Sequence, residues 1–375
     1  MSTALPPQAY AAALAAFPHM TIHRLGALLR HGGPHEAYEI AIGGHAPNGL
    51  IERVLADHEV RSAWQRAGRS TLLEDMWARC DRLGVQVLVL GGPGYPRLLI
   101  DDPLPPPVLF AQGELGLLEG RRAAIVGTRN ATAAGRDVAT SLGHGLAAAD
   151  VHVVSGLARG IDGCAHRGAL RTVDGGRPIA VVASGHDVVY PREHCDLWSR
   201  IAQQGLLLSE APPGTSPEAY RFPLRNRLIA ALAEVVVVVE SRERGGSLLT
   251  VNEAIMRNVP LMAVPGGVHN RAAAGTNQLI RDGAGVVVEP ADVLIALALD
   301  HRRAGASPTE PRPRPSRADL AVYETCAGAP RTIDSLALAC SLSLVDVAMS
   351  VARLEQTGWI QQIDGWFEAV GSPLR

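Results

Sequence analysis

The distribution of apolar and polar positions divides the chain into three stretches. Residues 1–82 favour helices, and LGALLRHGGPHEAYEI (25–40) has the pattern of two short helices around a Gly-Gly-Pro turn. Residues 85 to about 300 alternate short β-branched runs with helical segments. Residues 318–372 predict three helices followed by WIQQIDGWFEAV, two short strands around an Asp-Gly turn at 364–365.

Eight runs in the middle stretch are strand candidates, and most of them lack polar alternation. They are residues 85–90, 123–126, 151–154, 179–183, 205–208, 235–239, 261–264 and 286–288. Strands that are covered by helices on both faces show such continuous apolar runs. Because helical segments separate the runs, they predict an α/β fold with an open, mostly parallel sheet.

These patterns predict four parts of the chain. They are a helical domain over 1–82, a sheet domain over 83–300, a linker over 301–317 and a winged-helix domain over 318–375. The linker is indicated by RRAGASPTEPRPRPS, which is Pro-rich and has no apolar repeat. The Gly-Gly-Pro turn resembles a helix-hairpin-helix unit, which can bind a nucleic acid backbone through its amides, but a plain helical cap has the same pattern.

Composition narrows the choice of partners. The 375 residues are 47% hydrophobic and carry a net charge of -2, so any site for a polyanion must be a local patch. The sequence contains no lysine, so all 35 basic residues are arginine. This absence excludes mechanisms that need a lysine, such as the P-loop GK[ST], the kinase ATP lysine and a Schiff base.

Cysteine usage and the N-terminus indicate a cytosolic protein. The five cysteines are scattered without a CxxC pair, which is typical of free thiols in a reducing compartment. The N-terminus is Ala-rich but lacks the basic start of a signal peptide. No apolar run approaches the ~18 residues of a membrane helix.

The charge of the predicted winged helix argues against sequence-specific binding of duplex DNA. Residues 318–372 contain seven acidic residues and two arginines, a balance of -5. A recognition helix needs cations to meet the phosphates of duplex DNA. We therefore favour a protein-docking or regulatory role for this domain over a transcription factor, although Arg353 and the wing tip leave the second role open.

Polar turns follow the predicted strands and indicate a phosphate site. In AAIVGTRNATAAG (123–135) a strand ends at Gly127 immediately before a helix. Other turns follow further strands: SGLARGID (155–162), SGHDVVYP (184–191), RGGSLLT (244–250) and PGG (265–267). Because carboxyl ends of parallel strands meet at one edge, we expect these turns to form one rim. The first turn is not GxGxxG, and Ser155 ends the next strand where a dinucleotide site would have an acid.

Arginines distinguish this rim from a neutral nucleotide site. Five lie in or beside the turns: Arg129, Arg159, Arg192, Arg225 and Arg227. Residues 121–285 carry 18 arginines against 14 acidic residues, and arginine forks bind phosphates bidentately. FPLRNRLIAALAE places two of the arginines in the first turn of a predicted helix, where the helix dipole disfavours cations. We prefer an external anion there over surface pairs with acids such as Glu210.

These stretches resemble the DNA-processing protein A family (DprA, also called Smf). The shared motifs run in family order from about residue 95 to 288: IVGTR, VVSGLARGID, AHRGAL, VYP, LLSE, PPGT, FPLRNRLIAAL, VVVE, GSLLT and AVPG. The resemblance implies an extended Rossmann-like, mostly parallel sheet. It also implies an N-terminal helical domain of the helix-hairpin-helix or SAM-like type and a C-terminal winged helix.

The resemblance further implies a non-enzymatic protein without cofactor or metal. Family members bind single-stranded DNA during natural transformation, protect it and load RecA onto it, as homodimers formed through the Rossmann-like domain. Single-strand-binding protein is a further expected partner. The implied DNA-binding residues are Gly127, Thr128, Arg129, Gly156, Arg159, Arg192, Arg225, Asn226, Arg227, Ser247, Thr250 and Asn277. Because only 4% of residues are aromatic, we expect phosphate contacts to dominate and sequence preference to be weak.

Two enzyme-like alternatives have weaker support. PGG at 265–267 resembles the PGGxGTxxE signature of phosphoribohydrolases, which would make the chain a nucleotide hydrolase with Glu210 or Glu240 as acid. Val268 follows instead, and no glutamate stands at the catalytic spacing. A zinc site would use Cys164, His166, His194 and Cys195 as its four ligands. His194 and Cys195 are adjacent in a predicted helix, however, and side chains of adjacent helical residues do not readily point at one metal ion.

Overall fold

The computed structural model describes residues 5–43, 49–298, 312–363 and 365–370. It divides into two compact units, one of Met1–Ala131 with Ala139–Ala304 and one of Thr132–Val138 with Gly305–Arg375. Most of the predicted linker, residues 301–311, lies outside the described residues. The predicted boundaries between the four parts stay predictions.

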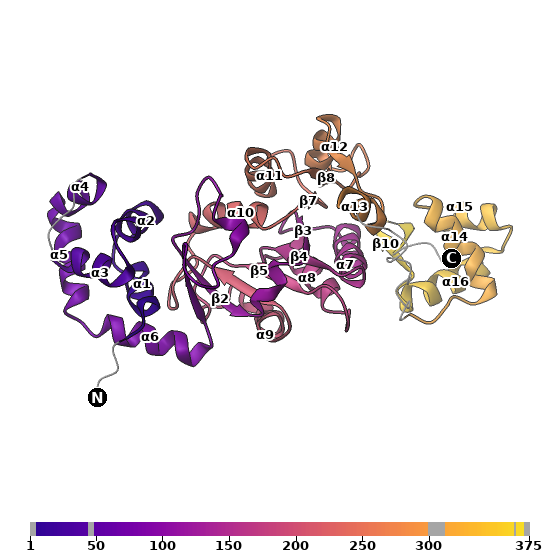
Figure 1. Cartoon of the computed structure of the whole chain (residues 1–375). Coiled ribbons are helices and arrows are strands. Elements are labelled where there is room, and N and C mark those ends of the chain that lie inside the picture. The colour runs from indigo at the N-terminus through magenta and orange to yellow at the C-terminus, as the bar shows by residue number, and fades with distance from the viewer. Residues whose placement is uncertain (1–4, 44–48, 299–311, 364, 371–375) are drawn as a thin grey trace. The chain divides into compact units, whose positions relative to one another are not determined.

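A nine-stranded mixed sheet forms the centre of the larger unit (Figure 1). Its strand order is β1-β2-β6-β5-β4-β3-β7-β8-β9. The bounds are β1 Gln86–Val89, β2 Val108–Gly113, β3 Arg121–Val126, β4 Val151–Ser155, β5 Pro178–Val181, β6 Leu206–Ser209, β7 Val235–Val238, β8 Leu261–Ala263 and β9 Gly285–Val286. The strands from β6 to β9 in this order pair in parallel, while β1 and β2 pair antiparallel at one edge.

The α/β, Rossmann-like fold and the mostly parallel sheet are thus confirmed, and each of the eight predicted runs contains or overlaps a strand. Strand β2 was not predicted. Its apolar run VLFA follows three prolines at 105–107. Proline cannot donate a hydrogen bond within a sheet, so these residues argue against a strand in this segment. The run VLFA, which is followed by Gln112 and by Gly113 at the end of the strand, carried the missing signal.

Helices pack on both faces of the sheet because alternate strand residues point to opposite sides. In β6, Leu206 and Leu208 belong to a core shared with α10 and α11, whereas Leu207 belongs to a core shared with α9. The helices and short 3-10 turns of this sheet part are η1 Arg97–Leu99, η2 Leu115–Leu118, α7 Ala133–Ala148, α8 Ile161–Ala169, η3 Arg192–His194, α9 Cys195–Gln204, α10 Arg221–Ala231, α11 Ser247–Met256, α12 Ala274–Arg281 and α13 Pro290–Ala296.

The strand order reverses beside β3, and this reversal positions the site. The chain passes from β3 to β4, β5 and β6 on one side, then returns to β7 on the other side of β3. In sheets of this kind, ligands bind at the carboxyl ends of the strands beside such a reversal. The turns after β3 and β7 are therefore neighbours at the edge where a ligand is expected.

Six helices precede the sheet and form the N-terminal part of the larger unit. They are α1 Pro7–Ala15, α2 Ile22–His31, α3 Pro34–Ile42, α4 Leu50–Ala56, α5 His58–Gly68 and α6 Leu72–Leu83. Helices α2 and α3 flank Gly32 and Gly33, as the Gly-Gly-Pro pattern predicted. Their core contains the fully buried Trp64, whose Nε1 donates a hydrogen bond to the Pro18 carbonyl over 2.8 Å.

The smaller unit contains three helices and a hairpin beyond the linker. The elements are α14 Arg317–Gly328, α15 Ile333–Cys340, α16 Leu344–Gln356, β10 Ile360–Ile363 and β11 Trp366–Ala369. They follow the predicted order, but the first wing-tip residue, 364, lies outside the described residues, and the winged-helix assignment stays a prediction. Among the described residues no single helix is long and apolar enough to cross a membrane, although the bent pair α15 and α16 together passes that test.

Candidate nucleic-acid interface

The turn after β3 is fixed by hydrogen bonds to two neighbouring elements. The Thr128 amide donates to the Glu240 carbonyl over 2.8 Å, and the Thr128 carbonyl accepts from the Ile161 amide over 3.3 Å. A Cβ added to Gly127 would lie 2.5 Å from Ile161 Cγ1 and 2.9 Å from the Glu240 carbonyl oxygen. Glycine is therefore required at 127, because any side chain would push the turn away from the end of β7 and from α8.

Arg129 is the exposed cation of this turn. Its guanidinium carbon lies 4.7 Å from the centre of the Phe222 ring, and Phe222 packs against Tyr190 with ring centres 5.4 Å apart. Among the described residues Arg129 forms no ion pair and no side-chain hydrogen bond, although its charge opposes the increase that burial causes in the pKa of the Asp162 carboxyl group. The aromatic pair thus holds a guanidinium in place by a cation–π contact and leaves its hydrogen-bond donors free for an anion.

Arg225 lies below this surface and joins two strand ends. It is buried, and its guanidinium donates to the carbonyl of Gly156 over 2.6 Å and to that of Val181. Burial lowers the pKa of Arg225 to about 10, while nearby Asp162 acts in the opposite direction. Asp162 also accepts a hydrogen bond from the Gly156 amide over 3.1 Å. A Cβ on Gly156 would collide with the Arg225 guanidinium at 2.5 Å, so glycine is needed here too.

Arg227 is buried in a different environment. It forms an ion pair with Glu210 and donates to the Leu104 carbonyl over 2.7 Å. Burial raises the pKa of Glu210 to about 7, although the charge of Arg227 opposes the increase. The prediction of an external anion at Arg227 is therefore wrong for the structure, in which Arg227 pairs with Glu210. Helix α10 begins at Arg221, so Arg225 and Arg227 lie beyond its first turn and the argument from the helix dipole does not apply to them.

Two predicted arginines lie near the loop that precedes α9. The exposed Arg159 forms a double hydrogen-bonded ion pair with Glu193, with distances of 2.5 and 2.6 Å. Its charge is therefore largely balanced by a neighbour. Arg192 begins η3, is exposed, and has no ion pair or side-chain hydrogen bond among the described residues. Arg192 is thus a second cation at this edge that is available to an anion.

The remaining predicted side chains mostly hold loops. The Ser247 hydroxyl donates to Ser241 Oγ over 2.9 Å at the start of α11, and Thr250 is buried in the same helix. The amide group of Asn277 exchanges two 3.0 Å hydrogen bonds with the backbone of Gly266. Asn226 is half-buried without a side-chain hydrogen bond among the described residues.

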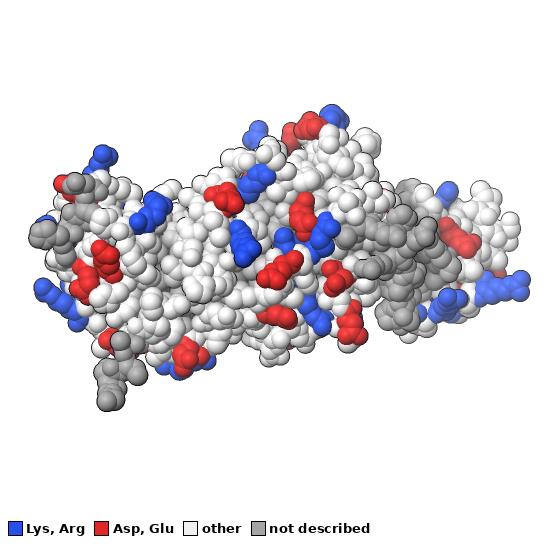
Figure 2. Space-filling view, in the orientation of Figure 1, with Lys and Arg blue, Asp and Glu red and all other residues white. Residues whose placement is uncertain are grey.

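Two exposed arginines beside the site were not among the predicted DNA-binding residues, although Arg244 begins the predicted rim turn RGGSLLT. Arg242 and Arg244 lie in the turn after β7, on the other side of the reversal from Arg129. The sequence SRERGGS begins at Ser241, with two residues between it and the end of the apolar strand β7, and that position was a usable signal. Figure 2 shows basic and acidic side chains mixed on the face in view, with wide uncharged areas between them. A basic site on this chain is therefore local, as the net charge of -2 requires.

The residues weighed for a zinc site have other surroundings. His166 is fully buried, which lowers its pKa to about 3. His194 Nδ1 lies 3.1 Å from the Leu157 carbonyl oxygen, and Cys164 and Cys195 are free thiols. Among the described residues no group of three or more His, Cys, Asp or Glu side chains is arranged to hold a metal ion.

Comparison with known proteins identifies the family. A family model described as DNA recombination-mediator protein A matches residues 86–298. A Mycobacterium tuberculosis relative described as a DprA-type DNA processing protein is 38% identical over 368 residues, which is 91% of this chain and 89% of the relative. DNA processing protein DprA of Bacillus subtilis is 40% identical over 211 residues, 56% of this chain and 70% of the relative.

Two solved structures are also similar. DNA processing protein A from Streptococcus pneumoniae aligns with a TM-score of 0.64 and 28% identity, covering 78% of this chain and 98% of that one. The Helicobacter pylori protein, whose structure is described with a single-stranded DNA binding mode, aligns with a TM-score of 0.51 and 29% identity, covering 57% and 95%. Because the family model spans more than half of its length, the chain belongs to the DNA recombination-mediator protein A family.

Proposed function

We propose that this chain binds single-stranded DNA without sequence specificity, through phosphates held at the carboxyl ends of β3 and β7. The observation that carries the proposal is Arg129, an exposed guanidinium held over Phe222 at the strand-order reversal with no ion pair among the described residues. Membership of the family and the description of the Helicobacter pylori relative support it.

The predicted site residues take two roles in this proposal. Gly127, Thr128 and Arg129 meet the phosphates directly, together with Arg192 and with Arg159 and Asn226 at the margin. The buried or loop-bonded residues form the frame that holds these contacts: Gly156, Arg225, Arg227, Ser247, Thr250 and Asn277. Such rigid support matters because a loosely held cation pays more conformational entropy when it binds.

A single strand suits this surface better than a duplex. The available cations are few and close to one edge, whereas a duplex reader needs a broad set of phosphate contacts. Two aromatic residues near the same edge of the sheet are exposed: Tyr190 to 39% and Tyr220 to 55%. Unpaired bases can stack on such rings, which adds affinity without strong sequence preference.

Membership of the family supports a proposal about the wider role. We infer that the chain protects single-stranded DNA and delivers it to the RecA recombinase in natural transformation or recombination, without a catalytic step of its own. In this proposal it acts in the cytoplasm as a homodimer formed through the sheet domain, with single-strand-binding protein as a further partner. The acidic stretch 318–372 then serves protein contacts, because its balance of -5 disfavours DNA.

Fluorescence anisotropy with a labelled oligonucleotide tests the proposal. We expect a single strand to bind more tightly than the same sequence as a duplex, with log affinity falling linearly against log salt concentration. Tighter binding of the duplex, or binding of a free nucleoside monophosphate while neither DNA binds, would refute it. RecA filament formation on a strand already covered by single-strand-binding protein, with and without this protein, then tests delivery.

A further inference from the structure

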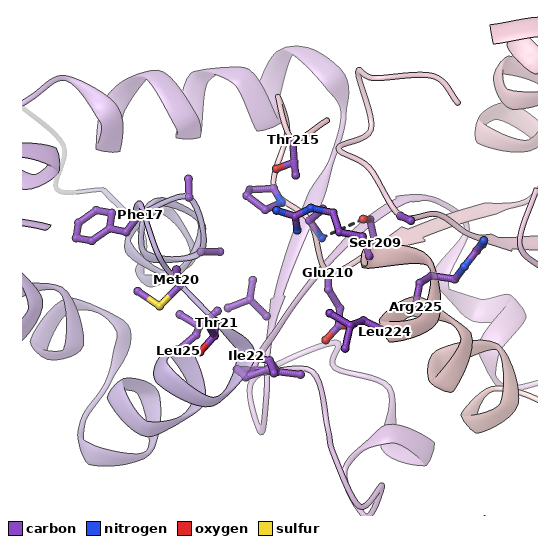
Figure 3. Close-up of a pocket in the computed structure, with 18 of the residues that line it drawn as sticks. Phe17, Met20, Thr21, Ile22, Leu25, Ser209, Glu210, Thr215, Leu224 and Arg225 are labelled. Carbon is purple, nitrogen blue, oxygen red and sulfur yellow. Dashed lines mark hydrogen bonds between the residues drawn. The ribbon is translucent and has the colours of Figure 1, made fainter. Parts of the chain in front are cut away.

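A cleft of about 890 Å³ lies within the larger unit, between its N-terminal helices and the sheet (Figure 3). Three of the four arginines that line it bind groups of the protein itself. Arg79 pairs with Asp187 over 2.6 Å, and Arg225 donates to two backbone carbonyls. Arg227 pairs with Glu210. These three side chains have partners without a ligand, whereas an apolar face of the smaller unit has no cover among the described residues.

Helix α16 is apolar on the side that faces its core and also on the opposite side. Val347, Val351 and Leu354 are buried in the core of the smaller unit. On the opposite side four exposed residues recur at i, i+3, i+4 and i+7, the spacing of one helix face: Val345, Ala348, Met349 and Ala352. Val345 is 72% exposed and Met349 is 57% exposed. A surface helix normally has polar residues on its outward side, so the packing of this unit does not account for the second apolar stripe.

The end of α15 extends this stripe. Leu338 lies in the last turn of α15 and is 84% exposed, and Leu344 is the first residue of α16 and is 53% exposed. The turn 341–343 joins the two helices, which are bent by 110° there. Scattered exposed apolar residues are normal on a protein, but a group of them on neighbouring turns marks an interaction site. We call the six exposed residues the α15–α16 face: Leu338, Leu344, Val345, Ala348, Met349 and Ala352.

Acidic side chains flank the α15–α16 face. The exposed charged residues between positions 333 and 356 are three acids and one arginine: Asp334, Asp346, Glu355 and Arg353. Arg353 donates to Asp319 over 2.6 Å, so its charge is balanced within the unit. Each of the three acids lies three or four residues from an exposed residue of the face, on a neighbouring turn of the same helix. A partner that covers the face therefore meets apolar groups at its centre and negative charges at its edge.

We propose that the α15–α16 face binds an amphipathic helix of a partner protein, in which Lys or Arg residues flank the apolar stripe. Two helices pack together when rows of side chains on their surfaces interdigitate, and the exposed stripe of α16 supplies such a row. The flanking cations of the partner then lie opposite the acidic residues at the edge of the face. The inference rests on the part of the proposed function that assigns protein contacts to residues 318–372, and it adds the surface and the kind of partner.

The acidic edge disfavours the other occupants of an apolar face. If a second copy of the chain covered it with the same face, like charges would lie opposite one another and repel. An anionic membrane surface and the phosphates of nucleic acid are repelled for the same reason. A protein helix of the opposite charge is therefore the occupant that the observations favour.

Two synthetic peptides of about 18 residues test the proposal, since shorter peptides are rarely helical in water. Both repeat leucine at i, i+3, i+4 and i+7, and the flanking positions are arginine in one peptide and glutamate in the other. Anisotropy of the labelled peptides measures their binding to the full chain at about 0.05 M salt. We expect the arginine peptide to bind at least about tenfold more tightly, with a smaller difference at higher salt. Equal binding of the two peptides, or binding of neither, would overturn the proposal.

A matched pair of substitutions locates the binding site. M349Q introduces a polar side chain of similar size and should weaken binding of the arginine peptide about tenfold, because it removes one apolar side chain from the contact. M256Q makes the same change on α11, where Met256 is 64% exposed, and should bind as the unaltered chain does. Both methionines are exposed, so neither variant should lose thermal stability. If M349Q and M256Q bind the peptide equally well, the peptide binds elsewhere and the face is not the site.

Further measurements on M349Q distinguish the other occupants. A smaller oligomer on sedimentation of M349Q than of the unaltered chain would show that a second copy covers the face. Binding to phosphatidylcholine vesicles that M349Q abolishes would show that a membrane covers it. We expect neither result, and each of them would overturn the proposal.

Binding of a labelled single strand, measured in parallel, separates this inference from the DNA-binding proposal. The affinity for the strand should be equal in M349Q and in the unaltered chain. Strand binding without peptide binding refutes only the inference about the α15–α16 face. Peptide binding without strand binding refutes only the DNA-binding proposal.

Discussion

Replacing Arg129 with alanine removes one exposed charge and leaves the frame of the site in place. Its guanidinium carbon lies 4.7 Å from the centre of the Phe222 ring, and it forms no ion pair among the described residues. Its removal uncovers one aromatic face, and an exposed cation–π contact contributes about 0.5–1 kcal/mol. The melting temperature should therefore change little, and a loss of binding would report the lost phosphate contact.

The expected loss of affinity follows from counterion release. Each phosphate neutralised on a single strand contributes about 0.7 to the slope of log affinity against log salt concentration. At about 0.1 M salt, one lost contact weakens binding about fivefold, or about 1 kcal/mol, and a bidentate arginine contact lies above that value. Anisotropy of a labelled single strand over a salt series measures both the affinity and the slope.

A charge-matched control distinguishes the loss of a specific phosphate contact from the general effect of a lower net positive charge. Arg61 is exposed on α5 and has no ion pair among the described residues, so R61A changes the net charge equally. We expect R61A to keep the slope of the unaltered chain. Equal slopes for R129A and the unaltered chain, or equal losses in R129A and R61A, would refute the assignment of a phosphate contact to Arg129.

Three further predictions concern the frame of the site and the smaller unit. R225A should lower the free energy of unfolding by about 3 kcal/mol in urea titrations, because it leaves the Gly156 and Val181 carbonyls without their donor; a loss below about 1 kcal/mol would contradict this role. G160A should lower the free energy of unfolding by about 1–3 kcal/mol and weaken strand binding. Gly160 has a φ of 71°, and a Cβ added to it would lie 2.3 Å from the Thr128 carbonyl oxygen. An unchanged DNA affinity would show that this turn does not support the site. The ion pair between Asp319 and Arg353 lowers the Asp319 pKa from 3.8 to about 2, so its stabilisation of about 2 kcal/mol is present above pH 3.8 and is lost as the pH falls toward 2; hydrogen exchange in α14 and α16 should show that loss, and D319N should abolish the pH dependence.

The fold could be predicted where burial leaves a direct trace in the sequence. The run at 235–239 is apolar at every position because strand β7 is covered on both faces. The strand at 108–113 escaped prediction because its short apolar run follows three prolines, although Phe110 pairs with Ser209 of β6 in the sheet.

The site was predictable in position and less so in function. A glycine that ends a strand marks the turn at 127–129 whatever surrounds it. The direction in which an arginine side chain on a helix points cannot be predicted in the same way, because it depends on how the helix is rotated relative to the sheet. Arg227 and Glu210 are 17 residues apart, and only the packing of α10 beside β6 shows that they neutralise each other.

Strand β2 has a consequence for how this protein can be divided. Its side chains alternate between two cores: Val108 and Phe110 pack with the N-terminal helices, while Leu109 and Ala111 pack within the sheet. Val87 on β1 also faces the helices. The helices therefore act as the outer cover of an edge of the sheet. A chain that begins after α6 would expose a continuous apolar strip on the edge strand β1 and on its neighbour β2, the kind of surface through which proteins aggregate. Excision at the apparent boundary near residue 83 therefore requires polar replacements on that strip.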